Sequence, residues 1–211
     1  MSMLVWNAPK ERSYENGVDH GVLYLKDVPG VVWNGITNVA EATVGAERTS
    51  YSLDGLRFLN SVSGRDFQAT VSAITVPPEF GVCIGEVPIV KGFFLTRQPR
   101  EMFGMSYRTR VNGDAGYKIH LVYNATATPS KRGYSTRGSS VSPTTHEWVI
   151  SAVPPPSTTY RPSAHLTIDS LESPADSLAA LESMLYGTPD TDPYLPSPDV
   201  IVDLFNPRSL L

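Results

Sequence analysis

Apolar and polar residues alternate along several stretches of the chain, and this pattern predicts strands. The clearest stretch is residues 103–111. On one side lie Phe103, Met105, Tyr107 and Val111, and on the other Ser106, Arg108 and Arg110. A period of two residues is typical of a strand with one buried face. The turn sequence NGDAG follows at 112–116, and the alternation resumes from Tyr117 to Ala125, so we expect an antiparallel hairpin.

Weaker versions of the same pattern predict further strands at 21–28, 36–44, 67–73, 146–153 and 164–171. In residues 67–73, small and apolar side chains alternate with Gln68, Thr70 and Ser72. The dipeptide Asp54-Gly55 is a turn signal that predicts a bend between two strands. Residues 77–85 begin with two prolines, which interrupt a sheet, and one helical turn is expected there.

Helical periodicity occurs late in the chain. Ser173 is the expected N-cap, with Pro174 at the first helical position and Asp176 at capping-box spacing. The apolar stripe consists of Leu178, Leu181 and Leu185, widened by Met184, and Gly187 is placed to end the helix. A second, short helix is predicted from Ser197-Pro198, burying Val200, Ile201, Leu204 and Phe205. The predicted fold is therefore mainly β (α+β), a sandwich or barrel with a C-terminal helix packed on the sheet.

Length and composition favour one domain. The chain has 211 residues, of which 41% are hydrophobic, and this is enough for one sizeable core. We expect a single domain over 1–211 with an N-terminal arm at 1–20, a long loop at 126–145 and a C-terminal arm at 188–211. The sequence shows no secretion signal and no apolar run long enough to span a membrane. The only cysteine, Cys83, is expected to be a buried hydrophobe.

Charge is distributed unevenly. Residues 101–165 contain 7 Lys and Arg against 3 Asp and Glu, a net +4, whereas residues 166–211 carry a net −7. This asymmetry is compatible with a nucleic-acid partner, with attraction between copies, or with a tail that folds back on the basic middle.

No motif predicts catalysis, a cofactor or a metal site. The sequence HEWVI at 146–150 lacks the second histidine of a zinc-protease motif, and the four histidines have no ligand spacing. The acidic segment 189–199 contains prolines that favour a solvated loop over a calcium site. We expect a protein that is not an enzyme.

The loop at 126–145 is longer than most connections and carries Lys131, Arg132, Tyr134 and Arg137. Three interpretations are open. The loop is a solvated hairpin tip, a finger whose cations bind DNA phosphates, or an arm that becomes ordered on a neighbouring copy with Tyr134 as its anchor.

Several segments resemble the major tail protein, or tail tube protein, of long non-contractile tailed bacteriophages. The most specific are MFGMSYRTRVNGD at 102–114, GYKIHLVYNA at 116–125 and LESMLYGT at 181–188. The resemblance covers roughly residues 17–205 in the order of the family.

The resemblance implies a structural virion protein without cofactors. Members of the family assemble as rings, usually hexamers, that stack into the tube through which the genome leaves the capsid. Implied partners are further copies of the chain, the tape-measure protein, the tail terminator and the distal tail proteins. The implied location is the virion tail, with assembly in the host cytoplasm and no membrane.

A channel for DNA is expected to be acidic or neutral, because tight phosphate binding would stall a polyanion. We therefore expect Lys131, Arg132, Tyr134 and Arg137 at contacts between subunits. Candidates for the lumen wall are Gln68, Thr70 and Ser72, or alternatively Lys118 and His120. Two other functions fit the composition: a β-sandwich that binds host carbohydrate as an adhesin, and a DNA-binding module.

Overall fold

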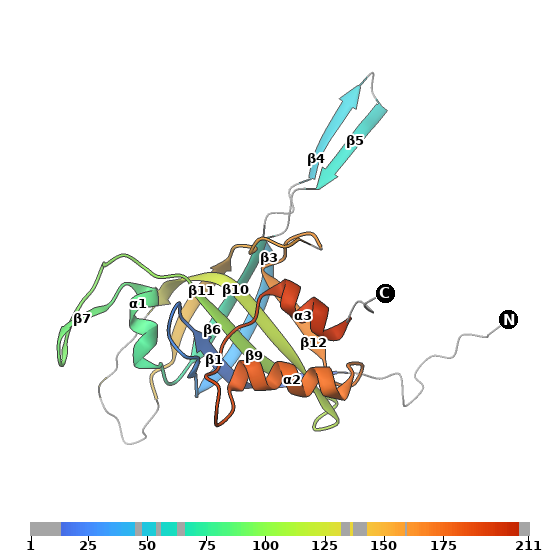
Figure 1. Ribbon diagram of the computed structural model, residues 1–211. Coiled ribbons are helices and arrows are strands. Elements are labelled where there is room, and N and C mark those ends of the chain that lie inside the picture. Colours follow the sequence, from blue (N-terminus) through green and yellow to red (C-terminus); the bar gives the residue numbers. More distant parts are fainter. Residues whose placement is uncertain are drawn as a thin grey trace.

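The computed structural model describes residues 14–44, 48–53, 56–62, 66–131, 136, 143–158 and 160–206 (Figure 1). Its strands are β1 (Glu15–Tyr24), β2 (Val31–Val32), β3 (Ile36–Val44), β4 (Arg48–Leu53), β5 (Leu56–Val62), β6 (Asp66–Ala73), β7 (Val87–Val90), β8 (Phe93–Leu95), β9 (Phe103–Val111), β10 (Gly116–Lys131), β11 (His146–Ala152) and β12 (His165–Asp169). Its helices are η1 (Pro78–Phe80), α1 (Gly81–Ile84), α2 (Ala175–Tyr186) and α3 (Pro198–Phe205). The prediction of a mainly β fold is confirmed.

Eight strands form one antiparallel sheet in the order β2-β1-β9-β10-β11-β6-β3, and β12 pairs with β10 beside this path. The long strand β10 organises the sheet, because its first part pairs with both β9 and β12 and its second part with β11. The sheet curls until β1 and β3 lie side by side. Gly21 is required at this junction, because a Cβ there would lie 2.8 Å from the backbone oxygen of Trp33.

The first core fills the inside of the curled sheet, where the apolar positions of β6, β9 and β11 point. It is built around rings: Phe80 lies 4.5 Å from Trp33 and 5.2 Å from Trp148 between ring centroids. The predicted inward face of β9 is confirmed, because Phe103, Met105, Tyr107 and Val111 are all buried. Cys83 is fully buried in this core, as expected, and burial raises the pKa of its thiol to about 12.

The second core lies between the sheet and the C-terminal helices, which cover β9 and β10 from outside (Figure 1). Leu181 and Leu185 of α2 are fully buried against it. The hydroxyl of Tyr24 donates a 2.8 Å hydrogen bond to the backbone oxygen of Leu185 and lies 3.1 Å from Oγ of Ser106. Because β9 is covered on both faces, Ser106 is buried although it occupies a polar position in the alternation.

The helix boundaries differ in detail from those predicted. Helix α2 begins at Ala175 with no side-chain cap, so the prediction that Ser173 caps it is wrong. Gly187 follows the helix with a φ of 77°, and a Cβ there would lie 2.9 Å from the backbone oxygen of Thr191. Helix α3 follows Ser197 as predicted and buries Ile201, but Val200 is 44% exposed rather than buried.

Several strands extend beyond their predicted limits. Strand β1 begins at Glu15, so residues 15–20 of the expected N-terminal arm are paired with β9. Residues 126–131 of the expected loop continue β10. Leu53 pairs with Leu56, which confirms a hairpin at the predicted Asp-Gly turn. No helix within the described ranges is long and apolar enough to cross a membrane.

Candidate functional site

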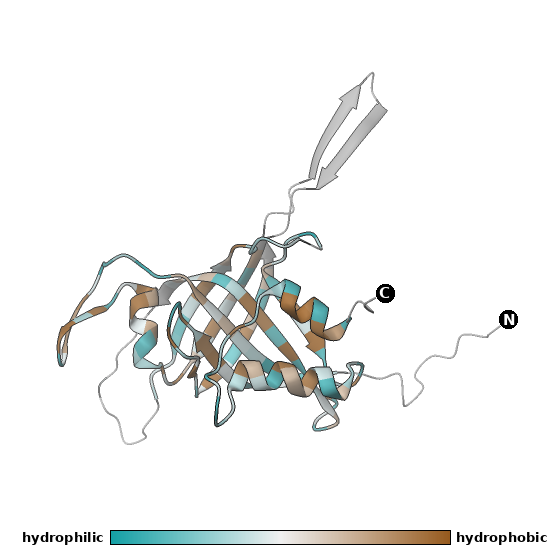
Figure 2. Ribbon diagram, in the orientation of Figure 1, coloured by the Kyte–Doolittle hydropathy of each residue, from teal (hydrophilic) through white to brown (hydrophobic). Residues whose placement is uncertain are grey.

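The hairpin of β7 and β8 exposes a set of large apolar side chains. Ile89, Val90, Phe93 and Phe94 are between 54% and 65% exposed, and Leu95 is 41% exposed. Figure 2 shows this apolar arm projecting from the body of the sheet. We call these five residues the hairpin patch. Contiguous apolar surface of this kind marks interaction sites, because leaving it in water is unfavourable.

The hairpin patch is carried on a fixed base. The short helix α1 anchors the entry to the hairpin, with Cys83 and Ile84 buried in the first core. The segment that follows the hairpin is bonded to the end of α1, because the amide of Gln98 donates a 3.0 Å hydrogen bond to the backbone oxygen of Gly85. Gly85 has a φ of 77° and a Cβ there would lie 2.6 Å from the oxygen of Gln98, so only glycine allows this approach. The apolar side chains lie away from the body, and none of them belongs to either core.

A second exposed apolar surface surrounds an open hollow of about 950 Å³ beside the ends of β1 and β9. Its lining includes Phe103 and Leu195, and its exposed apolar side chains are Val28, Met102 and Tyr194, at 46%, 58% and 50% exposure. The chain thus presents two different apolar surfaces. Contacts between unlike surfaces of identical chains generate rings or fibres.

Strand β3 is an edge strand: within the described residues, it pairs only with β6. An edge strand presents backbone donors and acceptors to which another chain can add a strand. Here the curl of the sheet brings β1 beside β3, so this edge is partly covered.

The outer face of β6 carries the predicted lumen residues Gln68, Thr70 and Ser72, all half-buried. Paired residues in neighbouring strands point to the same side of a sheet. In β3, β11 and β10 the residues on this side are Asn38, Ala40, Ala42, Glu147, Val149, Ser151, Thr126 and Thr128. We call this set, together with the three β6 residues, the neutral face. The set holds one carboxylate, Glu147, which is in register with the cationic residue Lys131 of β10.

The other two lumen candidates lie on the opposite side of the sheet. His120 is 6% exposed and lies against Tyr107 inside the curl, with a ring-centroid distance of 4.7 Å. Lys118 forms an ion pair with Glu15. The two predicted sets of lumen residues therefore do not share a surface.

The candidate contact residues of the basic loop fall largely outside the described part of the chain. Lys131 is the last residue of β10, where it pairs with Glu147. Arg132, Tyr134 and Arg137 lie outside the described residues.

Arg108 and Arg110 are both paired with one carboxylate. Nε of Arg108 lies 3.1 Å from Asp19 and Nε of Arg110 lies 2.9 Å from it, while the Arg108 guanidinium also lies 4.5 Å from the ring centroid of Tyr117. Partial burial raises the pKa of Asp19, but hydrogen bonds from Arg108, Arg110 and His20 outweigh it and hold this pKa below its ordinary value. The carboxylate therefore stays charged in the folded protein and is shared by both cations, while Glu182 lies 3.7 Å from Arg108 and Asp114 pairs with Arg110.

We expect Asp19→Asn to lower the free energy of unfolding by about 1–2 kcal/mol at pH 7, because the half-buried Arg108 loses the nearer of its two carboxylate partners, Asp19 and Glu182. A lowered carboxyl pKa stabilises the fold above the unfolded-state pKa, about 3.9, and this contribution is lost as the pH falls through the folded-state value. Urea denaturation of wild type and variant at pH 7 and pH 3 measures the difference, which should shrink at the lower pH. Asp114→Asn is the control, because that side chain is 85% exposed and, among the described residues, pairs with Arg110 alone. Equal stabilities of wild type and Asp19→Asn at pH 7 would contradict the expectation.

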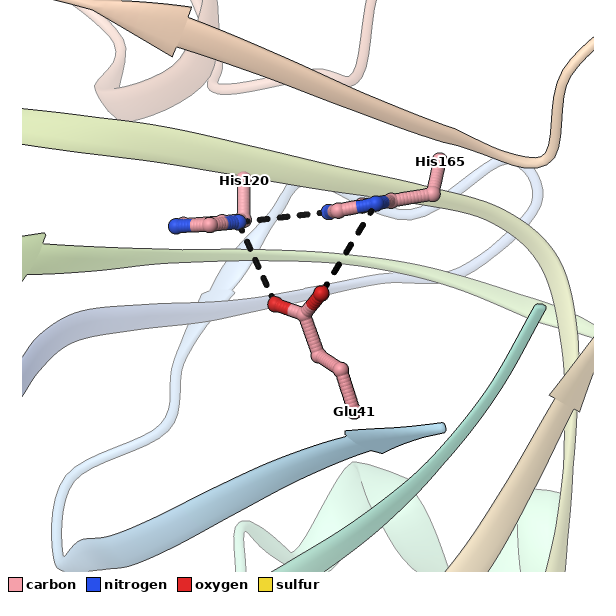
Figure 3. Close-up of side chains that lie close together, drawn as sticks. All are labelled: Glu41, His120 and His165. Carbon is pink, nitrogen blue, oxygen red and sulfur yellow. Dashed lines mark hydrogen bonds and ion pairs between the residues drawn. The ribbon is translucent and has the colours of Figure 1, made fainter. Parts of the chain in front are cut away.

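Inside the curl, Glu41 of β3, His120 of β10 and His165 of β12 converge (Figure 3). Nδ1 of His120 lies 3.2 Å from Nε2 of His165 and 3.3 Å from Oε1 of Glu41. The hydroxyl of Tyr107 donates a 2.5 Å hydrogen bond to the same Glu41 oxygen. Burial lowers the pKa of both histidines, although the Glu41 charge opposes this shift.

The histidine spacing in the sequence did not predict this cluster. The expectation that no histidine has a partner at ligand spacing is wrong for His120 and His165. Its three members lie on strands far apart in the sequence, and β12 meets β10 only through long-range pairing. One signal was available: Glu41 falls on the inward side of β3, in register with Ala69 of β6. A carboxylate at an inward position needs a polar partner inside the fold.

Comparison with known proteins gives similarity at the level of structure only. The sequence matches no family model and no curated protein. The structure is similar to a chain of the PVC sheath–tube complex of an extracellular contractile injection system in its extended state, with 10% identity, 71% of this chain and 88% of that chain covered, and a TM-score of 0.40. It is also similar to the tube-terminating cap of the anti-feeding prophage, with 10% identity, 79% and 100% coverage and a TM-score of 0.42. A third similar chain comes from the PVC sheath/tube terminator in the extended state, with 11% identity, 74% and 97% coverage and a TM-score of 0.39.

Proposed function

We propose that this chain is a structural subunit of a phage-type tail tube, which assembles with identical copies into stacked rings. The observation that carries the proposal is the hairpin patch. Its apolar side chains are exposed on a hairpin anchored through α1, and none of them belongs to either core. Such a surface becomes stable in water when another protein covers it. An identical copy is the partner that the unlike second apolar surface favours, because head-to-tail contacts close into rings.

Within this proposal the subunit is the major tail protein of a non-contractile phage tail, six copies form each ring, and the tube conducts the genome into the host. The sequence motifs at 102–114, 116–125 and 181–188 support this finer assignment through their resemblance to that family. The tape-measure, terminator and distal tail proteins are its proposed partners. Its proposed location is the virion tail.

The neutral face is the proposed wall of the lumen, and Gln68, Thr70 and Ser72 are its centre. A surface with few cations lets DNA pass, because few phosphates are held and few counterions are released by binding. Lys131, Arg132, Tyr134 and Arg137 are proposed contacts between neighbouring subunits, where cations pair with the acidic C-terminal part of the next copy.

Negative-stain electron microscopy of the purified full chain tests the proposal. Concentrated protein should form rings or tubes with a central hole, and sedimentation velocity should show species much larger than one chain. Protein that stays monomeric at high concentration, even with a tape-measure and terminator protein present, would contradict it. Binding of purified monomers to host carbohydrate would favour the adhesin alternative instead.

A further inference from the structure

We propose that Glu41, His120 and His165 form a binding site for a divalent transition-metal ion of the zinc class. Two imidazole nitrogens and one carboxylate are a donor set that such ions use in proteins. The three strands that supply them are β3, β10 and β12, and within the described residues β3 pairs only with β6 and β12 only with β10. A bound ion would therefore link β3 to β10 and β12, with which β3 does not pair in the sheet.

The spacing of the donor atoms fits a common ion. Two ligands at about 2.0–2.1 Å from one tetrahedral zinc ion lie about 3.4 Å apart. Nδ1 of His120 is 3.2 Å from Nε2 of His165 and 3.3 Å from Oε1 of Glu41. Figure 3 shows the Glu41 carboxylate beside the two rings, with one oxygen joined to Nδ1 of His120 and the other to Nδ1 of His165. Binding of one ion between the facing nitrogens would require Glu41 and the two rings to turn toward it.

A chain of hydrogen bonds places the ring proton of His120 on Nε2 and leaves Nδ1 as an acceptor. The hydroxyl of Thr109 donates to Oε2 of Glu15 at 3.0 Å and lies 3.0 Å from Nε2 of His120. Because a hydroxyl has a single proton, Thr109 must accept from His120, and Nε2 therefore carries the proton of a neutral ring. Metal-binding histidines are typically oriented in this way, through a donor bond from the second ring nitrogen.

The lone pair on Nδ1 of His120 lies beside a negative charge. Nδ1 of His120 and the Glu41 carboxylate are both acceptors, and they lie 3.3 Å apart. Without metal, Nδ1 of His120 shares the Nε2 proton of His165, and the Tyr107 hydroxyl donates to Oε1 of Glu41. A divalent cation would take the place of the shared proton and bind both imidazoles and the carboxylate.

The surroundings hold the site in place and leave it accessible. Tyr107 lies parallel to the His120 ring within 1°, and Phe67 lies 4.5 Å from His165 between ring centroids. The side chains of His120 and His165 are 7% and 19% exposed, whereas that of Glu41 is 37% exposed. An ion can therefore enter from the side of Glu41.

The test uses the full chain after treatment with a chelator. Addition of one equivalent of Co²⁺ should give the visible absorption bands of a low-symmetry, protein-bound ion, and saturating Zn²⁺ should raise Tm by about 5 °C. Both effects should be lost in Glu41→Gln and in His165→Gln. Thr109→Val keeps the shape of the side chain but removes the bond that orients His120, so it should weaken Zn²⁺ affinity by about 10–100-fold.

His20→Gln is the matched control, because His20 is exposed and lies outside the cluster; it should bind like wild type. Circular dichroism of each variant without metal establishes that it is folded. The proposal is overturned if folded wild-type protein gives no Co²⁺ bands and no shift in Tm at millimolar metal. It is also overturned if Glu41→Gln and His165→Gln respond to metal as wild type does.

Discussion

The double variant Phe93→Asp/Phe94→Asp is expected to abolish assembly while leaving the monomer folded. Both rings belong to the hairpin patch, with exposures of 54% and 58%. Aromatic side chains at the centre of an interface commonly contribute 2 kcal/mol or more, about 30-fold in affinity for each contact. A carboxylate in their place would be buried without a partner in every interface of a ring. We therefore expect rings and tubes to disappear from electron micrographs and sedimentation to show monomers.

The fold should tolerate this change, because none of the hairpin patch belongs to either core. Its Tm should match that of monomeric wild type. Val153→Asp is a suitable control, since Val153 is 59% exposed and lies outside the hairpin; it should assemble normally. Rings formed by the double variant at wild-type concentrations would show that the hairpin patch is not the interface. An unfolded double variant would show instead that the hairpin stabilises the body.

Trp148→Ala is expected to lower the free energy of unfolding by about 3–5 kcal/mol. Trp148 is 1% exposed and lies at the centre of the first core, with its ring 5.2 Å from Phe80 and 5.7 Å from Trp33. Alanine would remove the apolar contacts and leave a cavity beside Trp33 and Phe80. Small domains have a total stability of about 5–15 kcal/mol, so this one change would remove a large part of it.

Urea denaturation followed by circular dichroism measures this loss. Trp148→Phe is the graded variant, because it keeps an aromatic ring in the site and should lose clearly less stability than alanine. Tyr160→Ala is the surface control: Tyr160 is 60% exposed, and its removal should change stability by less than about 0.5 kcal/mol. A loss below 1 kcal/mol for Trp148→Ala would mean that the first core does not depend on this ring cluster.

Local sequence patterns predicted most of the secondary structure. The alternation from Phe103 to Val111 predicted the inward face of β9, because residues two apart in a strand point to the same side. The stripe of Leu181 and Leu185 predicted the buried face of α2, because residues four apart in a helix lie on the same face. Boundaries were less accurate. Nothing local distinguishes residues 15–20 from an arm, because their pairing partners lie on β9.

The candidate sites also differ in how far local sequence predicts them. The neutral character of Gln68, Thr70 and Ser72 follows from their alternation, but their shared surface with β11 and β3 depends on register between distant strands. The hairpin patch is a run of apolar residues that sequence alone would assign equally well to a core. Only the packing of α1 and the backbone bond from Gln98 to Gly85 show that it is directed outward.

The sequence by itself determined which residues alternate, where α2 forms and that no familiar catalytic motif is present, since these depend on neighbours within a few positions. The tertiary structure alone decided that Glu41, His120 and His165 meet, that Asp19 pairs with two arginines and that His120 faces inward. The physical reason is that these contacts arise from long-range strand pairing and from the curl of the sheet. Both are set by the burial of the whole chain, and no short stretch of residues contains them.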